Sequence, residues 1–375
     1  MPRPVAIVSG MIAAKPGHGG AVWAVLQYLL GLRQLGYDVV FVEPVDAENL
    51  ANSGSARYCD RVMRRFGFEG RWALVHPGRR ESVGLSRSEL RAIAKRADVL
   101  INISGMLTDP DVLDHIATRV YLDLDPAFVQ MWHAVDGIDM RMDAHTHFVT
   151  VADAIGEPTC PIPTCDRTWI PTLPPVVLSK WPIGESLEHD ALTTVANWRG
   201  YGVIDHAGVK YGLKVHSLRP LIDLPTRTNQ RFRLALVIHP DETRDLAALH
   251  DNGWELVDPY CVAGGPDDYR RFIQGSKAEF GIAKSGYVVS RSGWFSDRSA
   301  CYLASGRPVI AQDTGFGRRL PTGQGLFEFT VADDVVHAID ELAADYPRHR
   351  SAARQIAEEF FDSDRVLRAL LDRVT

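Results

Sequence analysis

Residues 292–310 combine the residue types of an anion-binding helix N-terminus. Ser296 or Asp297 can cap a short helix, and Arg298 follows them directly. The helix must end near Gly306, because the proline two positions later cannot continue it. Free N–H groups and the helix dipole at the N-terminus predict a site for a phosphate. A capped structural helix without a ligand is the alternative that these residues allow.

The loop of residues 15–20 is a second candidate for chemistry. Gly17, Gly19 and Gly20 allow the backbone to approach a ligand closely. His18 stands among them, and its ordinary pKa near neutrality suits a general base acting on a hydroxyl group. Hydrogen bonding within the loop is the simpler role for His18. The loop matches neither the Gly-x-Gly-x-x-Gly pattern nor a Walker motif, so by itself it predicts no nucleotide.

Three carboxylates stand at the ends of apolar runs. Asp123 and Asp125 end the run that begins at residue 119, where a carboxylate can orient or deprotonate an acceptor. Asp125 precedes a proline and can instead cap a helix. Glu43 ends the second apolar run and can bind a ribose in a dinucleotide-dependent oxidoreductase, which stays as an alternative.

The elements that position these residues alternate between strand and helix. Residues 5–9 and 38–43 predict strands, and residues 22–35 between them have helical spacing, which makes a right-handed βαβ unit. Further apolar runs predict strands at 98–105, 119–126, 146–151, 192–196, 232–238, 254–259, 278–283 and 308–312, and a final helix over 348–374. The candidate residues follow the carboxyl ends of these strands, where open α/β sheets bind ligands.

Length and composition limit the class of protein. At about 150 residues per domain, 375 residues predict two domains. Hydrophobic residues make up 46% and charged residues 23%, as in an ordinary globular chain. The net charge of −6 argues against a general binder of nucleic acid or of membrane surfaces, but it allows a small anion held by local cations.

The cysteines indicate a reducing compartment. An odd number, thinly scattered, argues against a disulfide framework and favours the cytoplasm. No second close pair of Cys or His completes a zinc site, so we expect no metal. No apolar run is long enough to span a bilayer, and the first residues lack the features of a signal peptide. The five cysteines are Cys59, Cys160, Cys165, Cys261 and Cys301.

Residues 304–310, Ala-Ser-Gly-Arg-Pro-Val-Ile, resemble the nucleotide-sugar site of two-domain GT-B glycosyltransferases. The glycine loop, long helix and strand at the start of the chain resemble the beginning of their acceptor domain. The resemblance implies an α/β fold of two Rossmann-like domains that face each other across a cleft. It implies an acceptor domain over 1–170, a nucleotide-sugar domain over 183–347, a Pro-rich linker region at 156–182, and a return of 348–375 to the first domain.

The resemblance also implies roles in donor binding. Arg199, after the first strand of the second domain, matches a basic residue that often meets the donor diphosphate. Lys284 is a candidate for a second cation, whereas Lys210 and Lys214 favour the interpretation of solvated surface cations. Glu279 joins Ser296, Asp297 and Arg298 as a donor-binding candidate. Because such cations stabilise the leaving diphosphate, the resemblance implies no metal and no cofactor beyond the donor.

One motif departs from the family pattern. Many retaining members carry two acids in this region, and the corresponding positions here are Gly293 and Cys301. The expected function is transfer of a sugar from a nucleoside-diphosphate sugar to a hydroxyl of a small-molecule or glycan acceptor. A nucleotide-sugar epimerase on the same fold and a non-catalytic sugar-nucleotide-binding partner are the alternatives.

Overall fold

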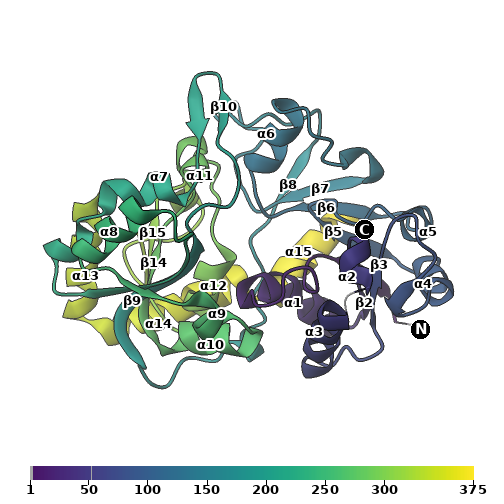
Figure 1. Cartoon of the computed structure of the whole chain (residues 1–375), viewed down its shortest axis with the longest axis horizontal. Coiled ribbons are helices and arrows are strands. Elements are labelled where there is room, and N and C mark those ends of the chain that lie inside the picture. The colour runs from purple at the N-terminus through teal and green to yellow at the C-terminus, as the bar shows by residue number, and fades with distance from the viewer. Residues whose placement is uncertain (1–2, 52) are drawn as a thin grey trace.

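The structure is a computed structural model that describes residues 3–51 and 53–375. Two sheets, each accompanied by helices, form two domains that lie side by side (Figure 1). Most strands are buried apolar runs paired in parallel, as expected for sheets that are covered by helices. Among the described residues, no helix is both long and apolar enough to cross a bilayer.

The first domain contains an eight-stranded sheet of order β4-β3-β2-β1-β5-β6-β7-β8. All neighbouring strands are parallel except β3 and β4, which are antiparallel. All five residues of β1 are buried at the centre of the sheet. The strands are β1 (Val5–Ser9), β2 (Asp38–Pro44), β3 (Trp72–Val75), β4 (Ser82–Gly84), β5 (Val99–Ile103), β6 (Arg119–Asp123), β7 (His147–Thr150) and β8 (Trp169–Pro171).

The second domain contains a parallel six-stranded sheet of order β13-β12-β9-β14-β15-β16. A separate antiparallel hairpin, β10–β11, projects beside α6 and α11 (Figure 1). The strands are β9 (His189–Asn197), β10 (Ile204–His206), β11 (Val209–Tyr211), β12 (Arg231–Val237), β13 (Glu255–Val257), β14 (Ser276–Gly281), β15 (Val309–Gln312) and β16 (Leu326–Phe329).

The helices follow the strands in the alternating order of α/β folds. Those before β9 are α1 (Gly19–Gln34), α2 (Ala47–Ala51), α3 (Ser53–Arg65), α4 (Arg87–Ala94), α5 (Pro110–Leu113) and α6 (Phe128–Ala134). Those after β9 are α7 (Lys214–Leu218), α8 (Thr243–Asp251), α9 (Pro259–Ala263), α10 (Pro266–Gly275), α11 (Ser285–Ser290), α12 (Asp297–Ala304), α13 (Ala332–Ala344), α14 (Tyr346–Ile356) and α15 (Ser363–Val374).

Each strand that the apolar runs predict is present, with ends that differ by a few residues. The apolar runs do not predict the strands of only three or four residues, which are β3, β4, β8, β16 and the β10–β11 hairpin. The predicted final helix is also interrupted: a π-helical turn, Ala357–Phe361, separates α14 from α15. Short strands escape a periodicity argument because three residues contain too little of a repeat.

The two domains join through segments 172–188 and 357–363. Val176 and Asp362 form a β-bridge, so the two crossing segments lie against each other. The Pro-rich stretch 156–182 includes β8, and its first part therefore belongs to the first sheet. Helix α14 still packs on α12 of the second domain, and α15 packs on α1 of the first. The C-terminal helix thus crosses back to the first domain, as the resemblance implied.

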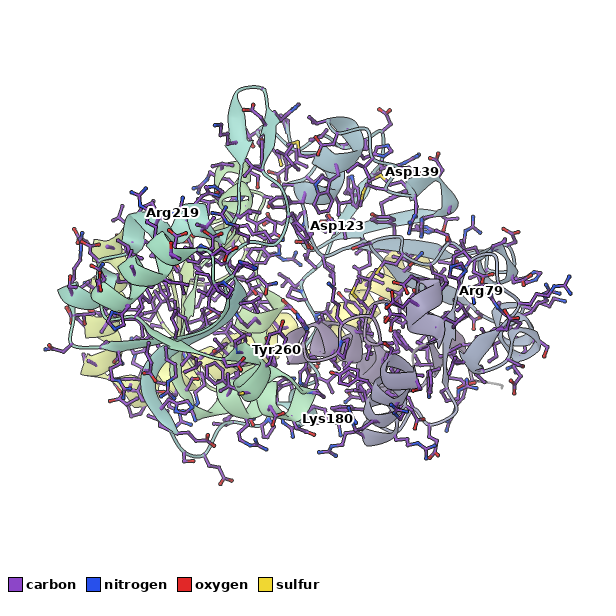
Figure 2. All side chains as sticks on the ribbon, in the orientation of Figure 1. Arg79, Asp123, Asp139, Lys180, Arg219 and Tyr260 are labelled. Atoms are coloured by element: carbon purple, nitrogen blue, oxygen red, sulfur yellow. The ribbon has the colours of Figure 1, made fainter. Side chains whose placement is uncertain are left out.

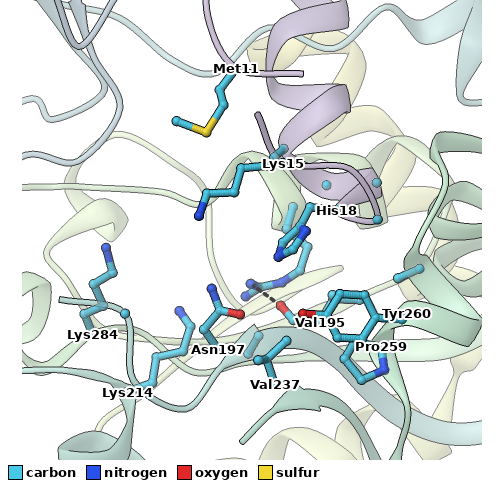
Figure 3. A pocket seen from close by; sticks show the side chains of 18 of the residues that line it. Met11, Lys15, His18, Val195, Asn197, Lys214, Val237, Pro259, Tyr260 and Lys284 are labelled. Atoms are coloured by element: carbon cyan, nitrogen blue, oxygen red, sulfur yellow. Dashed lines mark hydrogen bonds between the residues drawn. The ribbon is translucent and has the colours of Figure 1, made fainter. Parts of the chain in front are cut away.

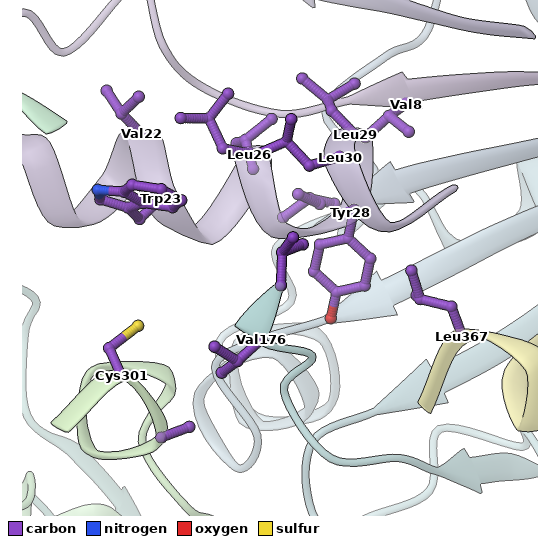
Figure 4. Packing of buried hydrophobic residues seen from close by; sticks show 14 of the residues in the cluster. Val8, Val22, Trp23, Leu26, Tyr28, Leu29, Leu30, Val176, Cys301 and Leu367 are labelled. Atoms are coloured by element: carbon purple, nitrogen blue, oxygen red, sulfur yellow. The ribbon is translucent and has the colours of Figure 1, made fainter. Parts of the chain in front are cut away.

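Helix α1 is the element that both domains share. It contacts β1, β2 and α15 on its own side and α10 of the second domain on the other. Trp23 packs against Trp181 with tilted rings whose centroids are 4.8 Å apart, and its indole N–H donates to the Pro266 carbonyl at 2.8 Å. Figure 4 shows Cys301 of α12 and Leu367 of α15 near this helix. An apolar cluster therefore continues from one domain into the other through α1.

The start of α1 approaches the second domain more closely than any side chain would allow. A Cβ atom on Gly19 would lie 2.3 Å from the Gly265 carbonyl oxygen and 2.6 Å from the Ala263 carbonyl oxygen. Both are backbone atoms, which cannot move aside as a flexible side chain does. Gly19 thus permits the backbone contact that fixes the separation of the domains on this side.

We predict that Gly19→Ala destabilises the protein. Because the new methyl group overlaps two carbonyl oxygens, the free energy of unfolding should fall by about 1–3 kcal/mol. Denaturant unfolding measures this change. Gly202→Ala is the matched control, since a Cβ there meets nothing within 4 Å, and it should leave stability almost unchanged. Equal stabilities for the two variants would contradict the close interdomain contact.

Candidate functional site

A cavity of about 540 Å³ lies between the two domains. The first domain lines it with the loop of residues 11–21, and the second domain with the ends of β9 and β12 and the starts of α7 and α9. Figure 3 shows Lys15 and His18 entering the space from the first domain, opposite Lys214 and Asn197. The cavity therefore lies at the carboxyl ends of the strands, where α/β sheets bind ligands.

The charges around this cavity are of one sign. Lys15, Lys214, Lys284 and Arg298 line it, and no Asp or Glu is among the lining residues of the described chain. Cations that converge on one space whose lining contains no carboxylate make a site for an anion. The arrangement can bind a phosphate group and stabilise negative charge that develops on it.

A buried ion pair fixes the Arg298 side chain. Its Nε lies 2.5 Å from Oε1 of Glu279, which is fully buried on β14, and its Nη1 donates to the Val195 carbonyl at 3.0 Å. The pKa of Arg298 is raised, because burial, which lowers it, is outweighed by Glu279. The resemblance implied that Glu279 binds the donor. In the structure Glu279 is not placed for a direct contact with sugar or ribose but orients Arg298.

Lys214 is the least compensated of the cations. It is the first residue of α7 and is half-buried, and no hydrogen bond or ion pair to its ammonium is found within the described residues. Burial lowers the pKa of Lys214 well below its ordinary value, and the charges of Arg298 and Lys284 lower it further. The sequence-based interpretation of Lys214 as a solvated surface cation is wrong, whereas Lys210 is exposed on the hairpin.

Arg199 does not line the cavity in the described structure. Its guanidinium pairs with Glu242, and the side chain is about half exposed. Side chains alternate along an extended segment, so the residue after Trp198, whose indole is buried, is directed outward. This placement corrects the sequence prediction: Lys214, not Arg199, lines the cavity.

Asp125 and Lys284 contact each other across the junction of the domains. The Lys284 ammonium lies 2.5 Å from Oδ1 of Asp125, and the hydroxyls of Tyr201 and Tyr287 also donate to this carboxylate. Burial raises the pKa of Asp125, but Lys284 and these hydrogen bonds outweigh burial and hold it below its ordinary value. Asp125 therefore does not cap a helix, and all three donors keep its carboxylate ionised and occupied.

Asp123 is fully buried. It lines neither the cavity between the domains nor the smaller cavity that adjoins it. It accepts hydrogen bonds from the Gln130 amide at 2.8 Å, the Thr150 hydroxyl at 2.9 Å and the Asp125 N–H at 2.9 Å. Burial raises its pKa to about 6, although these hydrogen bonds lower it. Asp123 thus holds the turn after β6 and has no access to an acceptor, which corrects its prediction as a base.

The glycine loop has two different surroundings. Gly17 has a φ of +83°, which favours glycine, and lines the cavity together with His18. His18 lies against the ring of Tyr260, with centroids 5.6 Å apart, and its Nδ1 is 3.3 Å from the Pro16 carbonyl oxygen. Gly19 and Gly20 also line the cavity, but the atoms they approach closely belong to α9 and α10, so their close approach is to protein rather than to a ligand.

A second cavity of about 290 Å³ adjoins the first and shares Lys214, Lys284 and Arg298 with it. Ser296 and Asp297 line this cavity. Ser296 occupies the N-cap position of α12, but its hydroxyl makes no capping hydrogen bond. Asp297 is open to the cavity, and the surrounding protein raises the pKa of its carboxyl by desolvation. The predicted helix N-terminus therefore faces the space between the domains.

Cys301, at the motif position of the missing glutamate, lines neither of the two cavities. Cys301 is buried, and its Sγ lies 3.7 Å from the Gln27 amide nitrogen of α1. Gly293 has a φ of +78°, and a Cβ there would overlap the carboxylate of Asp153. Both positions are therefore occupied by interdomain packing, which gives a physical reason for the absence of the paired acids.

Two further expectations concern ligands other than an anion. Glu43 is fully buried, and its carboxylate accepts the N–H groups of Ile12, Ala13 and Ala14 at 2.7–2.9 Å. It supports the loop after β1 and is not available to a ribose, which removes the oxidoreductase alternative. No group of three or more His, Cys, Asp or Glu residues in the described chain is arranged to hold a metal ion.

The sequence analysis did not select Lys15, Asn197 or Tyr260 as site residues, although all three line the first cavity. Lys15 begins the glycine loop, and Asn197 ends β9, the strand that precedes Arg199. Tyr260 lies in the first turn of α9, three residues after the end of β13, and its side chain is about half exposed. In Figure 2, the labelled residues Tyr260 and Asp123 both lie near the middle of the molecule. The positions of Lys15, Asn197 and Tyr260 after the ends of predicted strands are the signal in the sequence that could have identified them as site residues.

No protein-family model and no curated protein matches the chain. Solved structures do match it over its whole length. The α-glucosyltransferase AGT in complex with UDP has a TM-score of 0.61 at 11% identity and covers 100% of both chains. The chain has the GT-B fold. Anabaena Alr3699/HepE in complex with UDP and glucose matches this GT-B chain with a TM-score of 0.59 at 10% identity over 98% and 99% of the chains.

A third structure extends this comparison. A glycosyltransferase from Rickettsia africae matches with a TM-score of 0.55 at 12% identity, over 99% of this chain and 98% of the other. These similarities confirm the expected α/β fold of two Rossmann-like domains. Identities near 11% establish the fold, and the chemistry of the GT-B site in this chain must be argued from its own residues.

We predict that Asp123 makes stability fall as the pH rises from 4 to 7. Because its folded pKa of about 6 lies above the ordinary value near 4, the native state binds more protons than the unfolded state in this range. The free energy of unfolding of the wild type, relative to Asp123→Asn, should fall by about 2 kcal/mol between pH 4 and pH 7.

Urea unfolding at several pH values measures this difference. Asp136→Asn is the control, since Asp136 is exposed and should leave the pH dependence of the wild type unchanged. A wild type and an Asp123→Asn variant with parallel pH profiles would contradict the raised pKa.

Proposed function

We propose that the protein is a glycosyltransferase that moves a sugar from a nucleoside-diphosphate sugar to a hydroxyl of a small-molecule or glycan acceptor. The cavity between the domains carries this proposal, because four cations line it and no carboxylate of the described chain does. The diphosphate binds among Lys15, Lys214, Lys284 and Arg298. As the bond to the sugar breaks, these cations stabilise the charge that develops on the leaving group.

The size and location of the charge favour a small anion over a polymer. The cations are confined to one cavity of about 540 Å³, whereas the chain as a whole has a net charge of −6. A nucleic acid or a membrane surface requires a broad basic face. Some AGT structures contain DNA as well as UDP, but that acceptor is a property of those proteins.

UDP is the first nucleotide to test, because the matching AGT and HepE structures contain UDP. Those enzymes are transferases, so the comparisons favour neither the epimerase nor the non-catalytic alternative. An epimerase would convert a nucleotide-sugar to an isomer without an acceptor, whereas the proposed transferase releases nucleoside diphosphate.

His18 is the proposed general base. It lines the cavity, while Asp125 accepts three donors and Asp123 is buried away from both cavities. The proton of the acceptor hydroxyl moves to His18 as the acceptor oxygen bonds to the anomeric carbon and the bond from that carbon to the diphosphate breaks.

We propose that the enzyme needs no metal and no cofactor other than its donor. The supporting observation is the donor set: the first cavity presents ammonium and guanidinium groups, which supply the positive charge that a divalent cation would otherwise give. The cytoplasm is the proposed location, supported by five cysteines that are all free thiols.

We predict that UDP stabilises the protein and that Lys214 is required for this effect. UDP at a hundredfold excess over Kd should raise the Tm of the wild type by about 5 °C. In Lys214→Met, the Tm without ligand should rise, since a half-buried ammonium without a partner among the described residues is removed, and the shift with UDP should be lost. Thermal unfolding with and without UDP measures both effects.

Lys210→Met is the matched control, because this exposed lysine lies on the neighbouring hairpin and should leave the UDP shift intact. Arg199→Ala should also leave it intact. A wild type that does not respond to millimolar UDP, or equal losses in the Lys210 and Lys214 variants, would contradict the assignment of the donor site.

We predict metal-independent turnover that depends on His18. Release of UDP from UDP-glucose, followed over time, should continue at the same rate in excess chelator. In His18→Ala the rate should fall by about a hundredfold, as expected for loss of a general base, while the UDP-induced shift in Tm persists. Complete loss of turnover in chelator would refute metal independence, and full turnover in His18→Ala would assign the base elsewhere.

A further inference from the structure

The Asp125 carboxylate comes from the first domain, but its partners come from the second. Asp125 follows β6, whereas Tyr201 follows β9 and Lys284 and Tyr287 follow β14. Oδ1 accepts from the Lys284 ammonium at 2.5 Å and from the Tyr287 hydroxyl, and Oδ2 accepts from the Tyr201 hydroxyl at 2.8 Å. One carboxylate therefore gathers three donors across the domain junction.

Aromatic rings surround the same ammonium. The Lys284 nitrogen lies 4.0 Å from the ring centroid of Tyr201, 4.8 Å from that of Phe128 and 5.1 Å from that of Tyr287. Phe128 belongs to the first domain, and a Cβ on Gly286 would lie 2.9 Å from its ring. Ammonium groups over ring faces are attracted by the ring quadrupole, so the cage adds to the ion pair.

Hydrogen bonds within the first domain hold the turn that carries Asp125. Asp123 accepts the Asp125 N–H, and the Gln130 amide bridges Asp123 and the N–H of Ala127. Ala127 has a φ of +74°, which L residues rarely adopt, and Gln130 supports this conformation by its hydrogen bond. The turn is thus built to direct one carboxylate toward the second domain.

The Asp125 carboxylate and the aromatic rings restrict the position of the Lys284 ammonium. The Lys284 side chain is 16% exposed, and it lines both cavities between the domains. An uncaged lysine has four rotatable bonds and no fixed direction. With two of its donors directed to Asp125 and Tyr287, the third is left for the shared space of the cavities.

We propose that Asp125 is a positioning residue, which fixes the Lys284 ammonium at the donor diphosphate and so lets the first domain set the affinity of a site built mostly on the second. This proposal rests on the proposed function. It replaces the two roles expected from sequence, general base and helix cap, since the carboxylate acts through Lys284 rather than on the acceptor.

The experiment is a double-mutant cycle on UDP affinity, measured by calorimetry with the full chain. Asp125→Asn keeps the shape of the side chain but removes its charge, and UDP binding should weaken about tenfold. Lys284→Met should weaken it at least as much. Because Asp125 acts through Lys284, the double variant should bind UDP no more weakly than Lys284→Met alone.

Two further variants separate positioning from folding. Asp125→Glu should restore part of the affinity, because a carboxylate can again reach the ammonium. Tyr201→Phe removes one hydroxyl from a side chain that is 39% exposed, so it should fold normally and weaken UDP binding by about two- to threefold. The Tm of each variant without ligand shows whether a loss of affinity accompanies a loss of structure.

Asp267→Asn is the control for a cross-domain ion pair. Asp267 of α10 pairs with Arg65 of α3 at 3.0 Å, and neither residue lines the two cavities. This variant should bind UDP as the wild type does. Equal effects of Asp267→Asn and Asp125→Asn would assign the loss to domain contact in general and overturn a specific role for Asp125.

The sign of the effect is decisive. If Asp125 competed with the diphosphate for Lys284, Asp125→Asn would bind UDP more tightly than the wild type, which would overturn the proposal. Unchanged affinity, or an additive loss in the double variant, would also overturn it. Failure of the proposed function gives a different result, since the wild type itself would then not bind UDP.

Discussion

Positive charge in the cleft between the domains is the constraint on which the site depends. Burying a cation is costly unless a counter-charge or a ligand compensates for it. Arg298 is compensated by Glu279, and Lys284 by Asp125, and neither carboxylate lines the first cavity. Lys214 has no such partner among the described residues, so a bound anion would compensate its charge. The diphosphate of the proposed donor supplies that balance.

Two kinds of contact hold the domains at the separation that this charge arrangement needs. At α1 the contact is apolar and brings backbone close to backbone. Gly19 lies against the carbonyls of Ala263 and Gly265, and Trp23 packs on Trp181. At the turn after β6 the contact is polar, through Asp125 and its three donors. The cavities lie between these contacts, which explains how Lys15 and Lys284, far apart in the chain, line the same cavity.

The positions of most strands along the chain and the edge of the sheet that carries the site were predictable from sequence, because apolar runs have a clear pattern and ligands bind at strand ends. The roles of neighbouring acids were not. Asp123 and Asp125 are two residues apart and were both candidate bases, yet one is buried in the first domain and the other faces the second. Likewise, Arg199 had the expected position, but Glu242 pairs with it outside the cavity.

The sequence by itself determined the alternation of strands and helices, the two domains, and the set of residues at strand ends, since all of these follow from local patterns. Only the tertiary structure decided which of those residues meet. The sharing of Lys284 between two cavities, the exclusion of Glu43 and Glu279, and the inclusion of Lys214 depend on partners distant in the chain. Charge and burial are properties of that assembled environment, and a local pattern carries no information about it.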